Sequence, residues 1–195
     1  MSARKHSHLQ KFHLIEYILM LLRHLEIAKY IKNGQTLLDI GCGFNGHLLN
    51  RFSTHISHGI GIDLPVNQKK NSEKIQLIEW NLNNPSFPDL PKVDLATCLE
   101  VAEHVEDPLN LLKNIYQTLN DHGLLILTVP TWQEKPLAEF AAFKLKLLSA
   151  QEIADHKHYF SREEIIDCCH QAGFKNVKYS AHNFKMKNFV LARKN

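Results

Sequence analysis

The chain has 195 residues, which is enough for one domain with a substantial hydrophobic core. Hydrophobic residues make up 44% and charged residues 22%, a composition that is ordinary for a soluble globular protein. The net charge of +3 is too small to predict a nucleic-acid partner. The four cysteines of the chain show no C-x-x-C spacing, so we expect neither a zinc site nor a disulfide framework. We therefore expect a reducing, cytoplasmic setting.

The first region of the chain is predicted to be an N-terminal helical extension, residues 1–34, of one domain that covers residues 1–195. Apolar residues recur in it at helical spacing, which predicts an amphipathic helix that packs its apolar face on the domain. These residues are Leu14, Ile18, Leu21, Leu22 and Leu25. The most apolar stretch, residues 14–22, contains Glu16 and is too short to cross a bilayer, so no transmembrane segment is expected.

From residue 36 onward, apolar runs alternate with helical patterns, which is typical of parallel strands joined by right-handed crossovers. The last two strand-like runs are separated by only a short turn and are therefore expected to pair antiparallel. We predict an α/β fold: a Rossmann-like, doubly wound, seven-stranded, mostly parallel sheet with one antiparallel strand near its edge and helices on both faces. The expected strands are residues 36–40, 58–64, 74–80, 93–100, 123–130, 176–181 and 188–194, and the expected helices are residues 45–52, 107–119, 136–148 and 161–173.

In such a sheet the ligand lies outside the carboxyl ends of the strands. This rule alone places a candidate site at the strand ends, without a choice of function. The residues concerned are Asp39–Gly43, Asp63, Asn81, Leu99–His104 and Pro130–Trp132.

The stretch "LLDIGCGFNG" fits G-x-G-x-x-G, a pattern that grips a nucleotide cofactor. Asp63 lies about twenty residues further on, where either a dinucleotide or S-adenosylmethionine would use a carboxylate on its ribose, so it does not discriminate. Asp39 does discriminate between these two cofactors, because a carboxylate beside the glycine loop would repel a pyrophosphate and attract an ammonium or sulfonium group. S-adenosylmethionine is therefore favoured, and an NAD(P)-dependent oxidoreductase stays as the alternative. A P-loop is excluded, because no Lys-Ser/Thr follows the glycines.

Five segments, "LLDIGCGFNG", "GIGIDL", "LEVAEHVEDP", "LNDHGLLILTVP" and "HQAGFKNV", come in the order and spacing that resemble the class I S-adenosylmethionine-dependent methyltransferases. The resemblance is closest to the group that methylates small molecules and lipid or saccharide intermediates, including the ubiquinone O-methyltransferases. It implies S-adenosyl-L-methionine as cofactor, S-adenosylhomocysteine as product, and a set of cofactor contacts. These are Asp39, Gly41, Cys42, Gly43, Asp63, Leu64, Asn81, Leu82, Leu99, Glu100 and His104.

Within that set the resemblance implies distinct roles. Asp39 and the first two glycines would shape the pocket for the methionine end, and Leu99 would offer it backbone contacts. Asp63 would hold the ribose hydroxyls, with Leu64 against the adenine. Asn81 would contact the adenine amino group through its amide, since an amide both accepts and donates, or it is an ordinary turn residue. Only about ten residues separate Asp63 from the next strand, so the helix between them is expected to be short.

The segment after the fourth expected strand bears on the methyl acceptor. Enzymes that methylate amide or base-amino nitrogens often carry (Asn/Asp)-Pro-Pro-(Tyr/Phe) there, whereas this chain has "CLEVAEH". An oxygen acceptor on a small or lipid- or saccharide-linked molecule is therefore favoured. A non-catalytic S-adenosylmethionine-binding protein and an RNA 2′-O-methyltransferase remain as further alternatives.

A metal site is a separate hypothesis. Glu100, Glu103 and His104 have i, i+3, i+4 spacing and would share one face of a helical turn. With the downstream His156 they resemble the magnesium ligands of the small-RNA 3′-terminal 2′-O-methyltransferases, which implies Mg²⁺ on these four residues. In the alternative, Glu103 and His104 fix a helix start and line the cofactor pocket, and His156 is a catalytic base or substrate contact without a metal.

Residues 131–160 are expected to be an insertion that covers the acceptor pocket. The segment is apolar and aromatic, which is compatible with a lid over a lipid acceptor or a peripheral membrane contact. A helix packed on the domain, or a dimer contact, is the slightly preferred interpretation. Ser161–Glu164 is expected to form a capping box. The expected partner is a small-molecule or lipid- or saccharide-linked acceptor, nucleic acid is not expected, and the oligomeric state is left open.

Overall fold

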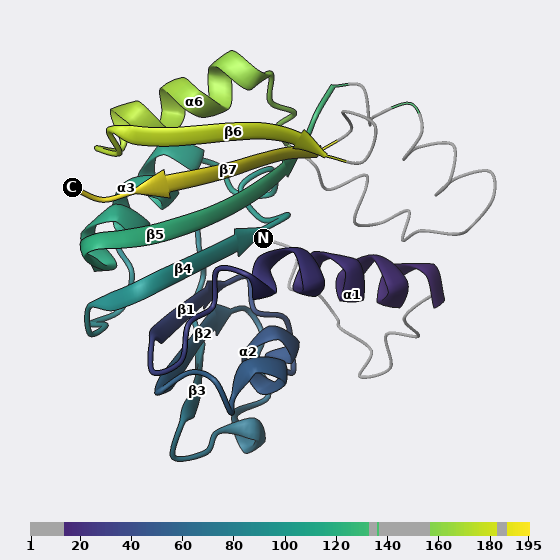
Figure 1. Cartoon of the computed structure of the whole chain (residues 1–195), viewed down its shortest axis with the longest axis vertical. Coiled ribbons are helices and arrows are strands. Elements are labelled where there is room, and N and C mark those ends of the chain that lie inside the picture. The colour runs from purple at the N-terminus through teal and green to yellow at the C-terminus, as the bar shows by residue number, and fades with distance from the viewer. Residues whose placement is uncertain (1–13, 133–135, 137–156, 183–186) are drawn as a thin grey trace.

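The computed structural model describes residues 14–132, 136, 157–182 and 187–195. These residues form a seven-stranded sheet in the order β3-β2-β1-β4-β5-β7-β6 (Figure 1). The strands are β1 (Thr36–Ile40), β2 (His58–Asp63), β3 (Ile75–Glu79), β4 (Val93–Leu99), β5 (Leu119–Pro130), β6 (Asn176–His182) and β7 (Lys187–Arg193). Within this sheet β7 alone is reversed, because it pairs antiparallel with both β5 and β6.

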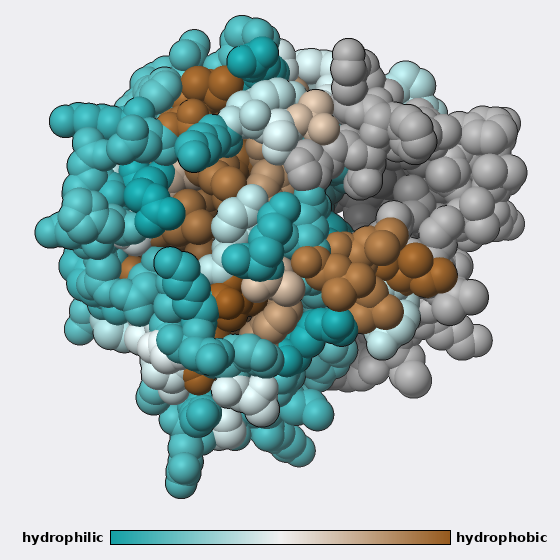
Figure 2. All heavy atoms as spheres, viewed as in Figure 1, coloured by the Kyte–Doolittle hydropathy of each residue, from teal (hydrophilic) through white to brown (hydrophobic). Residues whose placement is uncertain are grey.

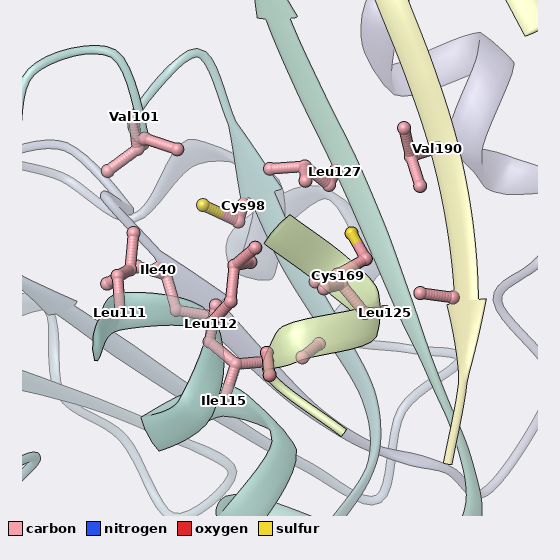
Figure 3. Packing of buried hydrophobic residues seen from close by; sticks show 14 of the residues in the cluster. Ile40, Cys98, Val101, Leu111, Leu112, Ile115, Leu125, Leu127, Cys169 and Val190 are labelled. Carbon is pink, nitrogen blue, oxygen red and sulfur yellow. The ribbon is translucent and has the colours of Figure 1, made fainter. Parts of the chain in front are cut away.

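Helices cover both faces of the sheet, as predicted. They are α1 (Leu14–Ala28), α2 (His47–Phe52), α3 (Pro108–Thr118) and α6 (Arg162–Gln171), with a short 3₁₀ helix η1 (Gln68–Lys70). One buried cluster joins α3 and α6 to strand residues such as Ile40 and Leu125 (Figure 3). A second joins α1 and α2 to Leu37 and Ile126. Because neighbouring strand residues point to opposite faces, the two clusters are the two layers of a doubly wound fold.

The helix starts follow from local sequence. Asp107 caps α3 by accepting a hydrogen bond from the Asn110 backbone N–H at 2.9 Å, and Pro108 takes the first helical position. Ser161 and Glu164 form the predicted capping box of α6. The connection between β2 and β3 holds only the three-residue η1, as the short spacing required.

β5 begins earlier than predicted. The sequence pattern places this strand at residues 123–130, but it already pairs with β4 at Leu119, opposite Val93. The register then shifts, so that Leu124 lies opposite Leu95. Residues 120–123 absorb the extra length, with His122 at a φ of 63°. Asn120, Asp121 and Gly123 are residues typical of turns, which is why the sequence pattern indicates a loop there.

The helix α1 forms as predicted, but its predicted apolar face is not the face that packs on the domain. Ile18, Leu22 and Leu25 are exposed, whereas Ile27 and His24 are buried. Ile27 joins the second core cluster, and the His24 ring lies 6.4 Å from the ring of Phe52 in α2. At 100° per residue these two groups occupy opposite sides of the helix, so α1 is held through its last turns and presents its apolar stripe outward. Across the described residues, no helix combines the length and the hydropathy needed to span a membrane.

Candidate active site at the carboxyl edge of the sheet

The glycine loop leaves β1 in a conformation that suits glycine. Gly41 and Gly43 have φ values of 71° and 69°. A Cβ at Gly41 would lie 2.2 Å from a methyl carbon of Val101, so the loop after β1 packs directly on the loop after β4. A Cβ at Gly43 would meet nothing within 4 Å. The loop is therefore closely packed at Gly41 and faces open space at Gly43.

Asp39 lies buried at the end of β1, opposite Thr97 of β4 in the sheet register. The Thr97 hydroxyl donates a hydrogen bond of 2.7 Å to its carboxylate. Burial raises the pKa of Asp39 to about 7, against the opposing effect of that hydrogen bond and with a further contribution from the charge of Asp63. A cationic ligand nearby would favour the ionised form. Asp39 is therefore suited to the ammonium or sulfonium end of a cofactor.

Asp63, at the end of β2, holds the glycine loop. Its carboxylate accepts one hydrogen bond from the Gly43 backbone N–H at 2.8 Å and another from the Leu64 backbone N–H at 2.6 Å. A carboxylate has about four acceptor sites, so both oxygens keep capacity for ribose hydroxyls. Leu64 is exposed beside it, where an adenine ring could stack. The open space at Gly43, the buried Asp39 and this oriented carboxylate fit S-adenosylmethionine.

Three other predicted cofactor contacts are placed as follows. Asn81 is exposed, and its side-chain oxygen accepts a hydrogen bond of 3.0 Å from the Asn83 backbone N–H, which supports the alternative that it is a turn residue. Leu82 is half-buried against the first core cluster. Cys42 is buried, and burial raises the pKa of its thiol well above the usual range, so it fills space in the loop rather than reacting.

The end of β4 carries an ion pair that the sequence did not predict. Beyond the half-buried Leu99, Glu100 has a φ of 58°, and its backbone N–H donates to the Thr128 carbonyl at 3.0 Å. Its carboxylate pairs with the ammonium group of Lys187, the first residue of β7. Burial opposes ionisation of Glu100, but the charges of Lys187 and of Arg23 in α1 outweigh it and hold the pKa below its usual value. Glu100 is therefore a carboxylate with a built-in counter-ion.

The predicted metal donors do not share a helical face. The positive φ of Glu100 breaks the helical turn on which that prediction depended, and no helix forms over residues 100–104. Glu103 is buried, and its charge adds to the effect of burial in raising the pKa of the Cys98 thiol, while His104 is half-buried. The described residues contain no group of three His, Cys, Asp or Glu side chains placed to hold a metal ion. Glu100, Glu103 and His104 thus give no support to a divalent cation, and the fourth predicted donor lies outside the described residues.

His156, predicted as a catalytic residue and as a metal ligand, lies outside the described residues, as does most of the expected lid at 131–160. Both remain predictions. The segment directly after His156 is described and is fixed to the strand ends. The backbone N–H groups of Lys157 and His158 donate to the Glu103 carbonyl at 2.8 and 3.2 Å. Asn188 of β7 donates through its side-chain amide to the Phe160 carbonyl at 2.9 Å.

An aromatic pair stands where this segment meets the end of β5. The rings of Trp132 and Tyr159 have centroids 5.4 Å apart and planes 33° apart. Trp132 is 55% exposed, although large aromatic side chains are usually well covered. The pair and the Glu100–Lys187 ion pair both lie at the carboxyl ends of β4 and β5, on the opposite side of β1 from Asp63. We call this part the acceptor side, and the part formed by Asp39, the glycine loop and Asp63 the cofactor side.

Sequence reasoning missed Thr97 and Lys187. A signal existed for Lys187: a reversed strand begins at the edge where parallel strands end, so the first residue of β7 has to lie beside the site. No comparable signal marked Thr97, whose role depends on the register between β1 and β4.

Comparison with known proteins agrees with this geometry. Residues 12–179 match the family model described as a methyltransferase domain. The chain is 27% identical over 172 residues to the ubiquinone biosynthesis O-methyltransferase of Colwellia psychrerythraea, covering 78% of this chain and 67% of the relative. It is 25% identical over 174 residues to the enzyme of the same name from Glaesserella parasuis, covering 80% and 72%.

Solved structures share the fold. A methyltransferase from Haloferax volcanii, in complex with the Trm112 methyltransferase activator, superposes with a TM-score of 0.67 at 16% identity, over 90% of this chain and 92% of that one. Phosphoethanolamine N-methyltransferase 2 from Haemonchus contortus, in complex with S-adenosyl-L-methionine, superposes with a TM-score of 0.66 at 17% identity. The match covers 89% of this chain and 52% of that one.

The fold and the cofactor side define a Rossmann-like, S-adenosylmethionine-dependent methyltransferase. Because its model covers most of the sequence, the chain belongs to the methyltransferase-domain family.

Proposed function

We propose that this enzyme methylates an oxygen atom of a small molecule or of a lipid- or saccharide-linked acceptor. The observation that carries the proposal is the Glu100–Lys187 ion pair on the acceptor side. A carboxylate can accept a hydrogen bond from a hydroxyl group, and an ammonium group beside it offsets the negative charge that develops on that oxygen. The pair thus offers a hydroxyl acceptor both orientation and electrostatic stabilisation.

Bound S-adenosylmethionine supplies an electrophilic methyl group, and the chain supplies mainly alignment. Transfer of this methyl group would form an O–C bond as the C–S bond breaks, and the electron pair of the broken bond would stay on the sulfur of S-adenosylhomocysteine. Glu100, held ionised by Lys187, would accept a hydrogen bond from the acceptor hydroxyl and orient it, and the hydroxyl proton would pass to solvent. Asp39 would hold the cationic end of the cofactor.

Further observations support an oxygen acceptor. The loop after β4 reads Leu99-Glu100-Val101 where amide- and base-amino-methylating enzymes often have Asn/Asp-Pro-Pro. The relatives from Colwellia psychrerythraea and Glaesserella parasuis carry the name O-methyltransferase. The exposed Trp132, with the half-buried Tyr159 beside it, suits a planar or apolar part of the acceptor. The four cysteines are free thiols, which supports the proposed cytoplasmic setting.

Calorimetric titration with S-adenosylhomocysteine, with and without Mg²⁺, tests the cofactor side first. Tight binding of this product, and none of NAD, is expected. A Mg²⁺ effect that disappears in Glu103→Ala would restore the metal hypothesis, although the described donors give it no support. Binding of NAD but not of S-adenosylhomocysteine would return the protein to the oxidoreductases.

Formation of S-adenosylhomocysteine from S-adenosylmethionine then tests the acceptor. The probes are a catechol (3,4-dihydroxybenzoate), an amine (phosphoethanolamine) and a single-stranded RNA. We expect turnover with the catechol and loss of most of it in Glu100→Gln. Turnover with the amine or the RNA alone would overturn the oxygen or the small-molecule assignment. Product binding without turnover on any probe would favour the non-catalytic alternative.

A further inference from the structure

Exposed apolar side chains gather at one edge of the molecule. Seven large hydrophobic residues are exposed among those described, and four of them lie on α1: Tyr17, Ile18, Leu22 and Leu25, at 46%, 45%, 56% and 60% exposure. The other three, Phe44, Leu64 and Trp132, follow β1, β2 and β5 at the carboxyl edge. Figure 2 shows the resulting apolar patch over α1. We call Ile18, Leu22 and Leu25, which recur at helical spacing, the α1 stripe.

The α1 stripe belongs to the same edge as the active site. Figure 1 shows α1 extending past the arrowheads of β4 and β5. The charge of Arg23 in α1 acts on Glu100 at the end of β4, so this helix lies beside the acceptor side. At 100° per residue Arg23 belongs to the packed side of α1, so a surface that covers the α1 stripe would lie across this helix from the acceptor side.

Basic residues flank α1 in the sequence. The thirteen residues before α1 contain Arg4, Lys5, Lys11 and three histidines, and no aspartate or glutamate. The exposed Lys29 follows the helix directly. An exposed apolar helix face flanked by basic residues is the pattern by which a helix lies in the plane of an anionic membrane surface.

We propose that the α1 stripe docks on an anionic lipid surface and turns the carboxyl edge of the sheet, with its active site, toward the bilayer. A second copy of the chain is the competing occupant, and ultracentrifugation distinguishes it from a lipid surface. The inference goes beyond the proposed function, since methyl transfer to an oxygen does not require a membrane.

Co-sedimentation with vesicles tests the proposal without any cofactor or acceptor. The probes are vesicles of phosphatidylcholine with phosphatidylserine and vesicles of phosphatidylcholine alone. The full chain is expected to partition onto the anionic vesicles and much less onto the neutral ones. The variant Ile18→Ser/Leu22→Ser/Leu25→Ser should lose about tenfold or more of this binding, because the apolar contact is removed. These side chains are exposed, so the variant should keep its fold and its affinity for S-adenosylhomocysteine.

Two variants that remove the same charge isolate the electrostatic contribution to vesicle binding. Arg4→Gln/Lys5→Gln/Lys11→Gln should weaken binding to the anionic vesicles strongly. Lys69→Gln/Lys70→Gln/Lys74→Gln removes the same charge from exposed positions between β2 and β3 and should change binding less than about twofold. The proposal is overturned if the wild-type chain does not bind anionic vesicles, or if the serine variant binds as well as wild type. It is also overturned if ultracentrifugation without vesicles shows a dimer that the serine substitutions dissociate.

Discussion

The cofactor side and the acceptor side of the active site are built from different kinds of contact. On the cofactor side, Asp63 holds the backbone of Gly43, only 20 residues away in sequence. On the acceptor side, Glu100 pairs with Lys187, 87 residues away. One side is therefore a local backbone structure at the ends of adjacent strands, and the other is a tertiary contact between side chains. We expect changes on the cofactor side to act on ligand affinity, and changes to the ion pair to act on stability and on the acceptor.

The largest effect should come from removing Lys187. In Lys187→Met the Glu100 carboxylate, whose side chain is only 15% exposed, loses its counter-ion. Leaving a buried charge unpaired should lower the free energy of unfolding by about 3 kcal/mol in urea denaturation. Glu100→Gln/Lys187→Met should recover much of this loss, because the charge is removed as well. Affinity for S-adenosylhomocysteine should change less than about threefold once folding is corrected for.

Lys157→Met is the matched control. Lys157 pairs with Glu106 at 3.6 Å, but these side chains are 39% and 76% exposed. An ion pair in that setting should contribute less than about 1 kcal/mol. If the two lysine variants are equally stable, the acceptor side does not depend on the buried pair.

Next in size is Asp63→Ala. It removes the carboxylate that orients the backbone of Gly43 and Leu64 and that would hold the ribose. Two or more charge-assisted hydrogen bonds should be lost, so affinity for S-adenosylhomocysteine should fall about 100-fold in calorimetry. Asp63→Asn keeps one acceptor oxygen and should lose less. Unchanged affinity in Asp63→Ala would mean that the end of β2 does not contact the cofactor.

Alanine variants of two glycines separate the cost of backbone strain from the cost of filling the cofactor space. Gly43 and Gly34 both have positive φ, and a Cβ at either would meet no atom within 4 Å. Gly43→Ala and Gly34→Ala should therefore each lose about 1 kcal/mol of stability through backbone strain. Only the Cβ at position 43 would enter the space assigned to the cofactor, so only Gly43→Ala should also weaken product binding, by about tenfold. Equal affinities in the two variants would leave the cofactor elsewhere.

An effect no larger than that of Gly43→Ala is expected from the titration of Asp39, whose pKa in the folded protein is about 7. The ammonium group of S-adenosylhomocysteine favours the ionised carboxylate, so affinity should rise about tenfold from pH 6 to pH 8, with release of a proton. The stability of the ligand-free protein should have the opposite pH dependence. The folded state binds the Asp39 proton more tightly than the unfolded chain does, so the free energy of unfolding should fall as the pH rises from about 4 to about 7. Asp39→Asn should flatten both profiles, and an affinity that is flat in wild type would contradict the assignment.

The contrast between the two sides also explains how much the sequence could predict. The strand order around the site, the glycine loop and Asp63 follow from hydrophobic patterns and short spacings, which are local properties. Lys187 could be placed only by knowing that β7 is reversed and inserted next to β5. The metal hypothesis used a helical spacing that the positive φ of Glu100 removes. Periodicity correctly predicted the helix α1, but it does not show which neighbour covers an apolar stripe, and the described neighbours cover the other side of this helix.

The reversed strand has a consequence for the order in which the protein is made. A ribosome delivers β1, β2, β4 and β5 first, and with them the whole cofactor side. Until residues 187–193 have emerged, the long β5 is an open edge, and β6 has no strand to pair with. A nascent chain can thus acquire a cofactor pocket well before Lys187 arrives to pair with Glu100. The last strand to be synthesised is the one that both seals the sheet and completes the acceptor side.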